Sequence, residues 1–107
     1  SKKNKKIKLI CIGNIYIGGT GKTPTVINLF KILKKLNLNV SIGKKFYKSH
    51  IDEIDLLKKE SNVIVDKSRK KIIQKAEKDK IDCLIFDDGL QDKTVSYDIQ
   101  FVCFSKI

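Results

Sequence analysis

Histidine and metal-binding cysteine motifs are almost absent from the sequence. His50 is the single histidine, and no two of the 3 cysteines have the spacing of metal ligands. A His-based zinc site or a Ser-His-Asp triad therefore has little to work with. The odd number of cysteines also argues against a disulfide framework. Because Cys11, Cys83 and Cys103 lie within apolar runs, we expect buried free thiols in a reducing cytosol.

Long apolar segments are also missing. No run is long enough to span a bilayer, and the basic residues 2–8 lead directly into a strand-like segment without a signal-peptide pattern. Aromatic residues make up 7% of the chain and do not alternate with its basic patches, which weakens an interpretation as a single-strand nucleic-acid binder.

Basic residues are abundant. Lysine and arginine together number 23 against 12 acidic residues, which gives a net charge of +11 over 107 residues. Such a surface attracts polyanions, namely nucleic acid, anionic lipid headgroups or phosphorylated substrates. The alternative, that most lysines only solvate helix faces, stays open. The lysine-rich patches cover residues 1–8, 31–35, 44–48 and 67–80.

Short apolar strands alternate with amphipathic helices along the chain, which predicts right-handed crossovers and a parallel sheet. We expect one small domain with a three-layer P-loop NTPase-type α/β fold, in which helices flank a mainly parallel, twisted sheet of about five strands. The predicted strands are 7–12, 40–43, 63–65, 83–86 and 101–104, and the predicted helices are 24–36, 51–60 and 68–80, the last capped by Ser68. The predicted inward-facing residues are Ile27, Leu29, Phe30, Leu33 and Leu36, then Ile51, Ile54 and Leu57, then Ile72, Ile73 and Ala76.

A glycine-rich stretch, Gly18-Gly19-Thr20-Gly21-Lys22-Thr23, stands between the first strand and the first helix. Strand, glycine-rich turn, Lys-Thr and helix is the layout of a phosphate-binding loop. Glycines let successive backbone N–H groups surround an anion, and the positive end of the helix dipole points at the same place. Pro24 suits the first turn, where its missing N–H has no helical partner. The strict pattern G-x-x-x-x-G-K-[ST] has a glycine where this chain has Tyr16.

This loop predicts a site for ATP and Mg²⁺. Lys22 can reach the outer phosphates of a nucleotide, and the hydroxyl of Thr23 can ligate Mg²⁺. An ordinary glycine turn before a helix is the alternative, but turn, lysine, threonine and flanking elements all agree with a nucleotide site. The predicted nucleotide-binding residues are Tyr16, Ile17, Gly18, Gly19, Thr20, Gly21, Lys22 and Thr23.

Two further acidic pairs are candidates for the chemistry. Asp87 and Asp88 follow the apolar strand 83–86, and the carboxyl ends of parallel strands share one edge of a sheet. Asp87 can therefore hold Mg²⁺ opposite the loop, with Asp88 as a second contact to the metal or its waters. A plain polar turn is the alternative. Asp52 and Glu53 open a predicted helix, where carboxylates often only complement the helix dipole.

The motifs resemble those of the tetraacyldisaccharide 4′-kinases, the lipid A 4′-kinase family. That family reads roughly G-N-x-x-x-G-G-x-G-K-T-P at its loop, and residues 13–24 read G-N-I-Y-I-G-G-T-G-K-T-P. The family's D-D-G-F-Q-H motif appears as D-D-G-L-Q-D at residues 87–92, followed by Asp98-Ile99. A family G-D-E-P motif is echoed as I-D-E-I at residues 51–54, and an S-R-G-Y-G segment as S-I-G-K-K-F-Y at residues 41–47.

The resemblance implies a reaction and roles for these residues. ATP would donate its γ-phosphoryl group to the 4′-hydroxyl of a lipid A disaccharide precursor, at the cytoplasmic face of the bacterial inner membrane, whose anionic surface the lysines would contact. Lys22 would neutralise phosphate charge, Thr23 and Asp87 would position Mg²⁺, and Asp52 would receive the hydroxyl proton, with Asp88 as the competitor for that role. The match covers only the N-terminal part of the family, so we expect residues 1–107 to be the P-loop domain of a longer, two-domain kinase.

Two other functions remain open at this stage. The compact GG-x-GKT loop also occurs in partitioning-type P-loop ATPases, although Ile17 stands where those proteins often carry a lysine. The net charge alone would also fit a nucleic-acid-binding module, an interpretation that the scarcity of aromatic residues disfavours.

Overall fold

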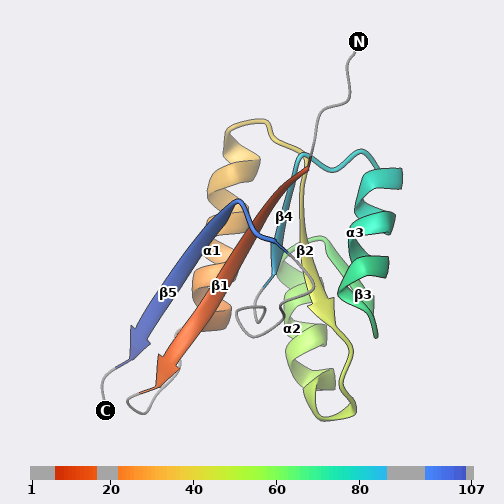
Figure 1. Ribbon diagram of the computed structural model, residues 1–107. Coiled ribbons are helices and arrows are strands. Elements are labelled where there is room, and N and C mark those ends of the chain that lie inside the picture. The colour runs from red at the N-terminus through yellow and green to blue at the C-terminus, as the bar shows by residue number, and fades with distance from the viewer. Residues whose placement is uncertain (1–6, 17–21, 87–95, 106–107) are drawn as a thin grey trace.

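The computed structural model describes residues 7–16, 22–86 and 96–105, with the backbone alone at 14–16, 22–24 and 101–105. Strands and helices alternate as predicted, and a short 3-10 turn, η1, precedes the second helix (Figure 1). The elements are β1 (Lys8–Tyr16), α1 (Lys22–Lys35), β2 (Val40–Lys45), η1 (Lys48–His50), α2 (Ile51–Glu60), β3 (Val63–Asp66), α3 (Arg69–Lys78), β4 (Cys83–Phe86) and β5 (Ile99–Ser105).

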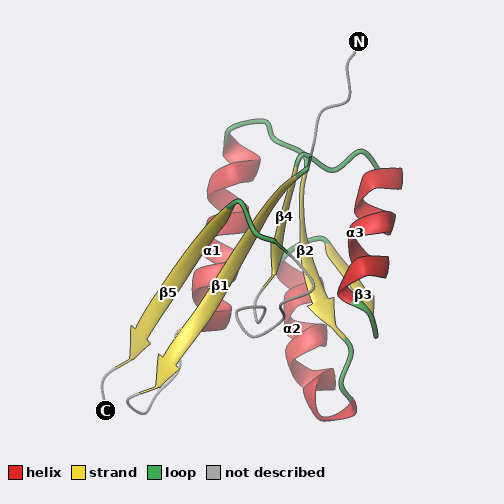
Figure 2. Cartoon of the chain, in the orientation of Figure 1, coloured by secondary structure: helices red, strands yellow, loops and turns green. Residues whose placement is uncertain are grey.

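The strands form one five-stranded sheet in the order β3-β2-β4-β1-β5, and every neighbouring pair is parallel. β4 lies at the centre of this order, between β1 and β2, although it follows both of them by many residues in the chain (Figure 2). The parallel sheet with helices between its strands confirms the predicted α/β class.

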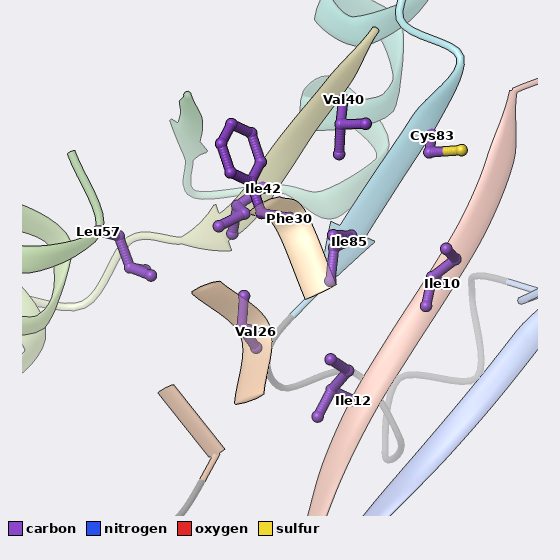
Figure 3. Close-up of a cluster of buried hydrophobic side chains, with 9 residues drawn as sticks. All are labelled: Ile10, Ile12, Val26, Phe30, Val40, Ile42, Leu57, Cys83 and Ile85. Carbon is purple, nitrogen blue, oxygen red and sulfur yellow. The ribbon is translucent and has the colours of Figure 1, made fainter. Parts of the chain in front are cut away.

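The helices cover both faces of the sheet, as a three-layer fold requires. α1 and α2 pack on one face, where alternate residues of β1, β2 and β4 point toward them (Figure 3). This cluster contains Ile10, Ile12, Val26, Phe30, Val40, Ile42, Leu57, Cys83 and Ile85. α3 packs on the opposite face, where the buried residues are Ile7, Ile72, Ala76, Ile81, Leu84 and Phe86.

The predicted thiols and helix cap agree with the structure where it describes them. Cys11 and Cys83 are buried free cysteines, and burial raises the pKa of the Cys83 thiol. The side chain of Cys103 lies outside the described residues. Ser68 is the N-cap of α3, and its hydroxyl oxygen accepts a hydrogen bond from the Lys71 backbone N–H at 3.4 Å.

Three predictions about boundaries and packing were wrong. β1 does not end at the predicted residue 12 but continues to Tyr16, because β5 pairs with it from Ile10 to Tyr16. Leu36 is 64% exposed because α1 ends one residue earlier, and the chain then turns through Asn37 at a φ of 64°. Ile51 is 50% exposed because it is the first residue of α2, before the helix reaches the core. Val26, which the predicted stripe of α1 omitted, is fully buried.

Gly43 allows the side chains of Ile72 and Phe86 to pack closely against the backbone of β2. A Cβ atom at this position would come within 2.8 Å of Phe86 Cε1 and 2.9 Å of Ile72 Cγ2. We expect Gly43→Ala to lower the free energy of unfolding by about 1–3 kcal/mol, because an overpacked core forces side chains or backbone to shift. Urea denaturation measures this loss. Combining the substitution with Phe86→Leu should recover part of it if the ring is the obstacle, and unchanged stability in Gly43→Ala would contradict the close packing.

Candidate nucleotide site

The carboxyl end of β4 lies beside the middle of β1, because Phe86 pairs with Cys11 and β1 continues to Tyr16. Residues 8–11 of β1 pair with residues 83–86 of β4 in parallel register, from Lys8↔Cys83 to Cys11↔Phe86. From β1 the chain continues to β2, on the far side of β4, and from β4 it continues to β5, on the far side of β1. In open α/β sheets, ligands bind at the carboxyl ends of the strands.

Helix α1 begins at this edge without an acidic residue in its own first turn. Lys22, Thr23 and Pro24 form this turn. α2, in contrast, begins with Asp52 and Glu53 in its first turn. Because negative charge is stabilising at a helix N-terminus, the start of α1 fits an anionic ligand such as the phosphates of a nucleotide.

Several predicted site residues lie outside the described part of the chain. Of Tyr16, Lys22 and Thr23 the structure gives only the backbone, at the end of β1 and the start of α1. The roles assigned to all these residues therefore remain predictions. The residues outside the described part are Ile17, Gly18, Gly19, Thr20, Gly21, Asp87 and Asp88.

The first turn of α2 carries Asp52, the residue predicted to accept the hydroxyl proton. Asp52 is exposed on this turn. Because the strands are parallel, α2 and α1 both begin at the carboxyl edge of the sheet (Figure 1). Asp52 and the start of α1 therefore share this edge.

Lys44 of β2, which the sequence analysis did not single out, contacts this first turn of α2. Lys44 is only 2% exposed, and its Nζ lies 3.4 Å from Oε1 of the neighbouring acid, Glu53. The alternation Val40, Ile42, Lys44 along β2 would have placed this lysine on the inward face, but a lysine in a basic stretch is usually exposed.

A separate open cavity of about 370 Å³ lies at the carboxyl ends of β2 and β3, lined by Phe46, Val65, Asp66, Lys67 and Lys71. Asp66 is bound there on two sides. Lys75 Nζ lies 3.1 Å from its Oδ2, and the backbone N–H of Ser68 donates to its Oδ1 at 3.1 Å. The hydrogen bond from Lys75, followed by that from Ser68, lowers the pKa of the Asp66 carboxyl below its ordinary value of 3.8.

The sheet order and the strand–loop–helix layout at β1 define a P-loop-type α/β nucleotide-binding protein. The family model for tetraacyldisaccharide-1-P 4′-kinase matches residues 1–54 and 47–106. The chain belongs to the tetraacyldisaccharide 4′-kinase family. No described helix is both long and apolar enough to cross a bilayer.

Individual relatives agree with this assignment. A tetraacyldisaccharide 4′-kinase of Pelagibacter ubique is 45% identical over 104 residues, which are 97% of this chain and 33% of that protein. One from Rickettsia conorii is 35% identical over 111 residues, covering 89% of this chain and 35% of the relative. A crystal structure of LpxK from Aquifex aeolicus, described as in complex with ATP, has a TM-score of 0.76 at 26% identity, over 90% of this chain and 38% of that one. The chain thus spans about a third of the length of the curated relatives it matches.

The contacts of Asp66 predict an acid-dependent part of the stability. Because its native pKa lies below the unfolded value, its contribution is fully present above about pH 4 and is lost as the pH falls through the native pKa. We expect Lys75→Met to make the unfolding midpoint less dependent on pH below pH 4. Near pH 7, the dependence of the midpoint on pH should stay almost the same. Thermal unfolding between pH 2.5 and 7 measures this, with exposed Lys70→Met as the control. If the unfolding midpoint of Lys75→Met falls with pH below pH 4 as steeply as that of the wild type, this pair does not hold the Asp66 carboxyl ionised.

Proposed function

We propose that this chain is the ATP-binding part of a tetraacyldisaccharide 4′-kinase. The complete enzyme transfers the γ-phosphoryl group of ATP to the 4′-hydroxyl of a tetraacyldisaccharide 1-phosphate, a step of lipid A synthesis. The observation that carries the proposal is the family match across residues 1–54 and 47–106. The similar LpxK structure, which is in complex with ATP, supports the choice of nucleotide. The same match favours a kinase over a partitioning-type ATPase or a nucleic-acid-binding module.

The residues at the start of α1 suit the phosphates of ATP. The helix begins with Lys22 and has no acid in its first turn, so its backbone N–H groups and the Lys22 ammonium would meet the anion without a carboxylate from this turn. Thr23 and Asp87, with Asp88, would hold Mg²⁺, an ion that prefers oxygen ligands. When bound, this ion would neutralise charge on the transferring phosphoryl group.

Asp52 is our candidate for the group that accepts the proton of the sugar hydroxyl. Its exposure allows it to meet a bulky acceptor, and its place at the start of α2 puts it on the carboxyl edge of the sheet. Asp88 is the alternative base.

Binding of the acceptor and contact with the membrane are properties that we propose for the whole protein. The chain spans about a third of its relatives, so binding of the acylated disaccharide is proposed for the full-length protein. Exposed Ile32 and Leu36 lie beside the exposed lysines Lys31, Lys34 and Lys35 near the end of α1. Apolar and basic groups together suit peripheral contact with an anionic membrane surface, which we place at the cytoplasmic face of the inner membrane.

Lys22→Ala tests the nucleotide site. We expect turnover to fall by about 10²–10³-fold, because one charge-stabilising group at a transferring phosphoryl is worth that much, and we expect weaker binding of Mg-ATP. Calorimetry measures binding, and transfer of labelled γ-phosphate to the disaccharide measures turnover. Lys58→Ala, an exposed lysine near the end of α2, is the control. Unchanged ATP uptake in Lys22→Ala would overturn the proposed site, and an active wild type that phosphorylates only another acceptor would overturn the proposed substrate.

Asp52→Asn tests the base. We expect kcat to fall by about 10²–10⁴-fold while the Kd for ATP stays within about twofold, since a general base acts on the acceptor hydroxyl and not on the nucleotide. Asp55→Asn, an exposed acid on the same helix, is the matched control. If Asp88→Asn instead lowers kcat at unchanged Mg²⁺ dependence while Asp52→Asn does not, the base is Asp88.

A further inference from the structure

Lys44 is the one buried residue with a charged side chain in the part of the chain that the structure describes. An ammonium group is rarely removed from water unless a counter-charge accompanies it, because the loss of hydration is large. Here the counter-charge is the Glu53 carboxylate, at 3.4 Å from Lys44 Nζ and itself about one-third exposed. The pair therefore joins the interior of the sheet to the surface of α2.

The sheet end of this pair is held firmly. Lys44 lies on β2, an inner strand that is paired to β3 on one side and to β4 on the other. Its neighbour Gly43 is packed tightly against Phe86 and Ile72 on the opposite face. The backbone that carries the lysine consequently has little room to move.

The helix end has no comparable support from its own cap. His50, the N-cap residue of α2, makes no side-chain capping hydrogen bond, and the buried residues of α2, Ile54 and Leu57, come after its first three positions. Glu53 is the third residue of the helix and Asp52 the second. The contact of Glu53 with Lys44 thus ties the turn that carries Asp52 to the sheet.

We propose that Lys44 is a positioning residue for phosphoryl transfer: by holding Glu53, it fixes the first turn of α2 and the direction in which Asp52 presents its carboxylate. This inference rests on the proposed function, in which Asp52 takes the proton of the acceptor hydroxyl. Lys44 itself is buried and touches neither substrate in this scheme. Its effect is on the geometry of the base, to which proton transfer is sensitive.

The first experiment separates positioning from nucleotide binding. In the full-length protein, we expect Lys44→Met to lower kcat by about 10- to 100-fold, the scale of a misplaced catalytic group, with the Kd for ATP within about twofold. Lys44→Arg keeps the charge and should restore most of the loss. Lys31→Met is the matched control, since Lys31 also pairs with an acid of α2, Glu60, but at 4.0 Å, at the other end of the helix and with both side chains exposed. Equal effects of Lys31→Met and Lys44→Met would overturn the inference.

The second experiment asks whether Lys44 acts through Asp52. In an Asp52→Asn background, the added Lys44→Met substitution should cost less than about twofold in kcat, because residues that act as a unit are non-additive. A multiplicative loss would mean a general structural role and would overturn the inference. If Lys44→Met does not fold, Glu53→Gln replaces it in the same double-mutant cycle, because it breaks the same ion pair from the helix side. A wild type without kinase activity would refute the proposed function, whereas an active wild type with unchanged Lys44→Met and Glu53→Gln kinetics would refute only this inference.

Discussion

The pairing of β4 with both β1 and β2 is the constraint on which the rest of the structure depends. Cys83 is opposite Lys8 on one side and Val40 on the other, and the three strands run in the same direction. Because the strands are parallel, their carboxyl ends point toward the same edge of the sheet, although β1 continues from Cys11 to Tyr16 beyond the end of β4. In the sequence, the glycine-rich segment follows β1, Asp52 follows β2 and the acidic pair follows β4. The proposed phosphoryl-transfer site needs an anion cradle, a metal ligand and a base, and a parallel sheet directs all three connections toward one edge.

The same packing explains why a lysine can be buried at this edge. β2 is an inner strand with a core on each face, so its alternate residues have no access to water once α1 and α2 are in place. Lys44 follows Val40 and Ile42 on the inner face and can be accommodated only with a carboxylate beside it. Glu53, which would otherwise only complement the dipole of α2, provides that carboxylate. An acid that the sequence makes look ordinary therefore has a second partner in the fold.

Local patterns predicted the elements well and their ends less well. Short apolar runs located every strand, and the 3.6-residue period located every helix, because both depend on residues close in sequence. The errors lie where an element meets something distant. β1 continues to Tyr16 because β5 pairs with it, and Leu36 and Ile51 are exposed because α1 and α2 end and begin beside them. No local pattern reports the presence of a neighbouring strand or the limit of the core.

The sequence by itself determined which residues are candidates for the chemistry. The glycines, Lys22, Thr23 and the acidic pair stand in an order and spacing that predict a phosphate-binding loop and its metal ligand, because backbone geometry and side-chain reach are local properties. Only the tertiary structure decided that β4 lies between β1 and β2, and that Lys44 meets Glu53 across a sheet–helix boundary. Strand order and such ion pairs depend on which distant surfaces pack best together. That choice is made by burial of apolar area over the whole domain, and no short window of sequence contains it.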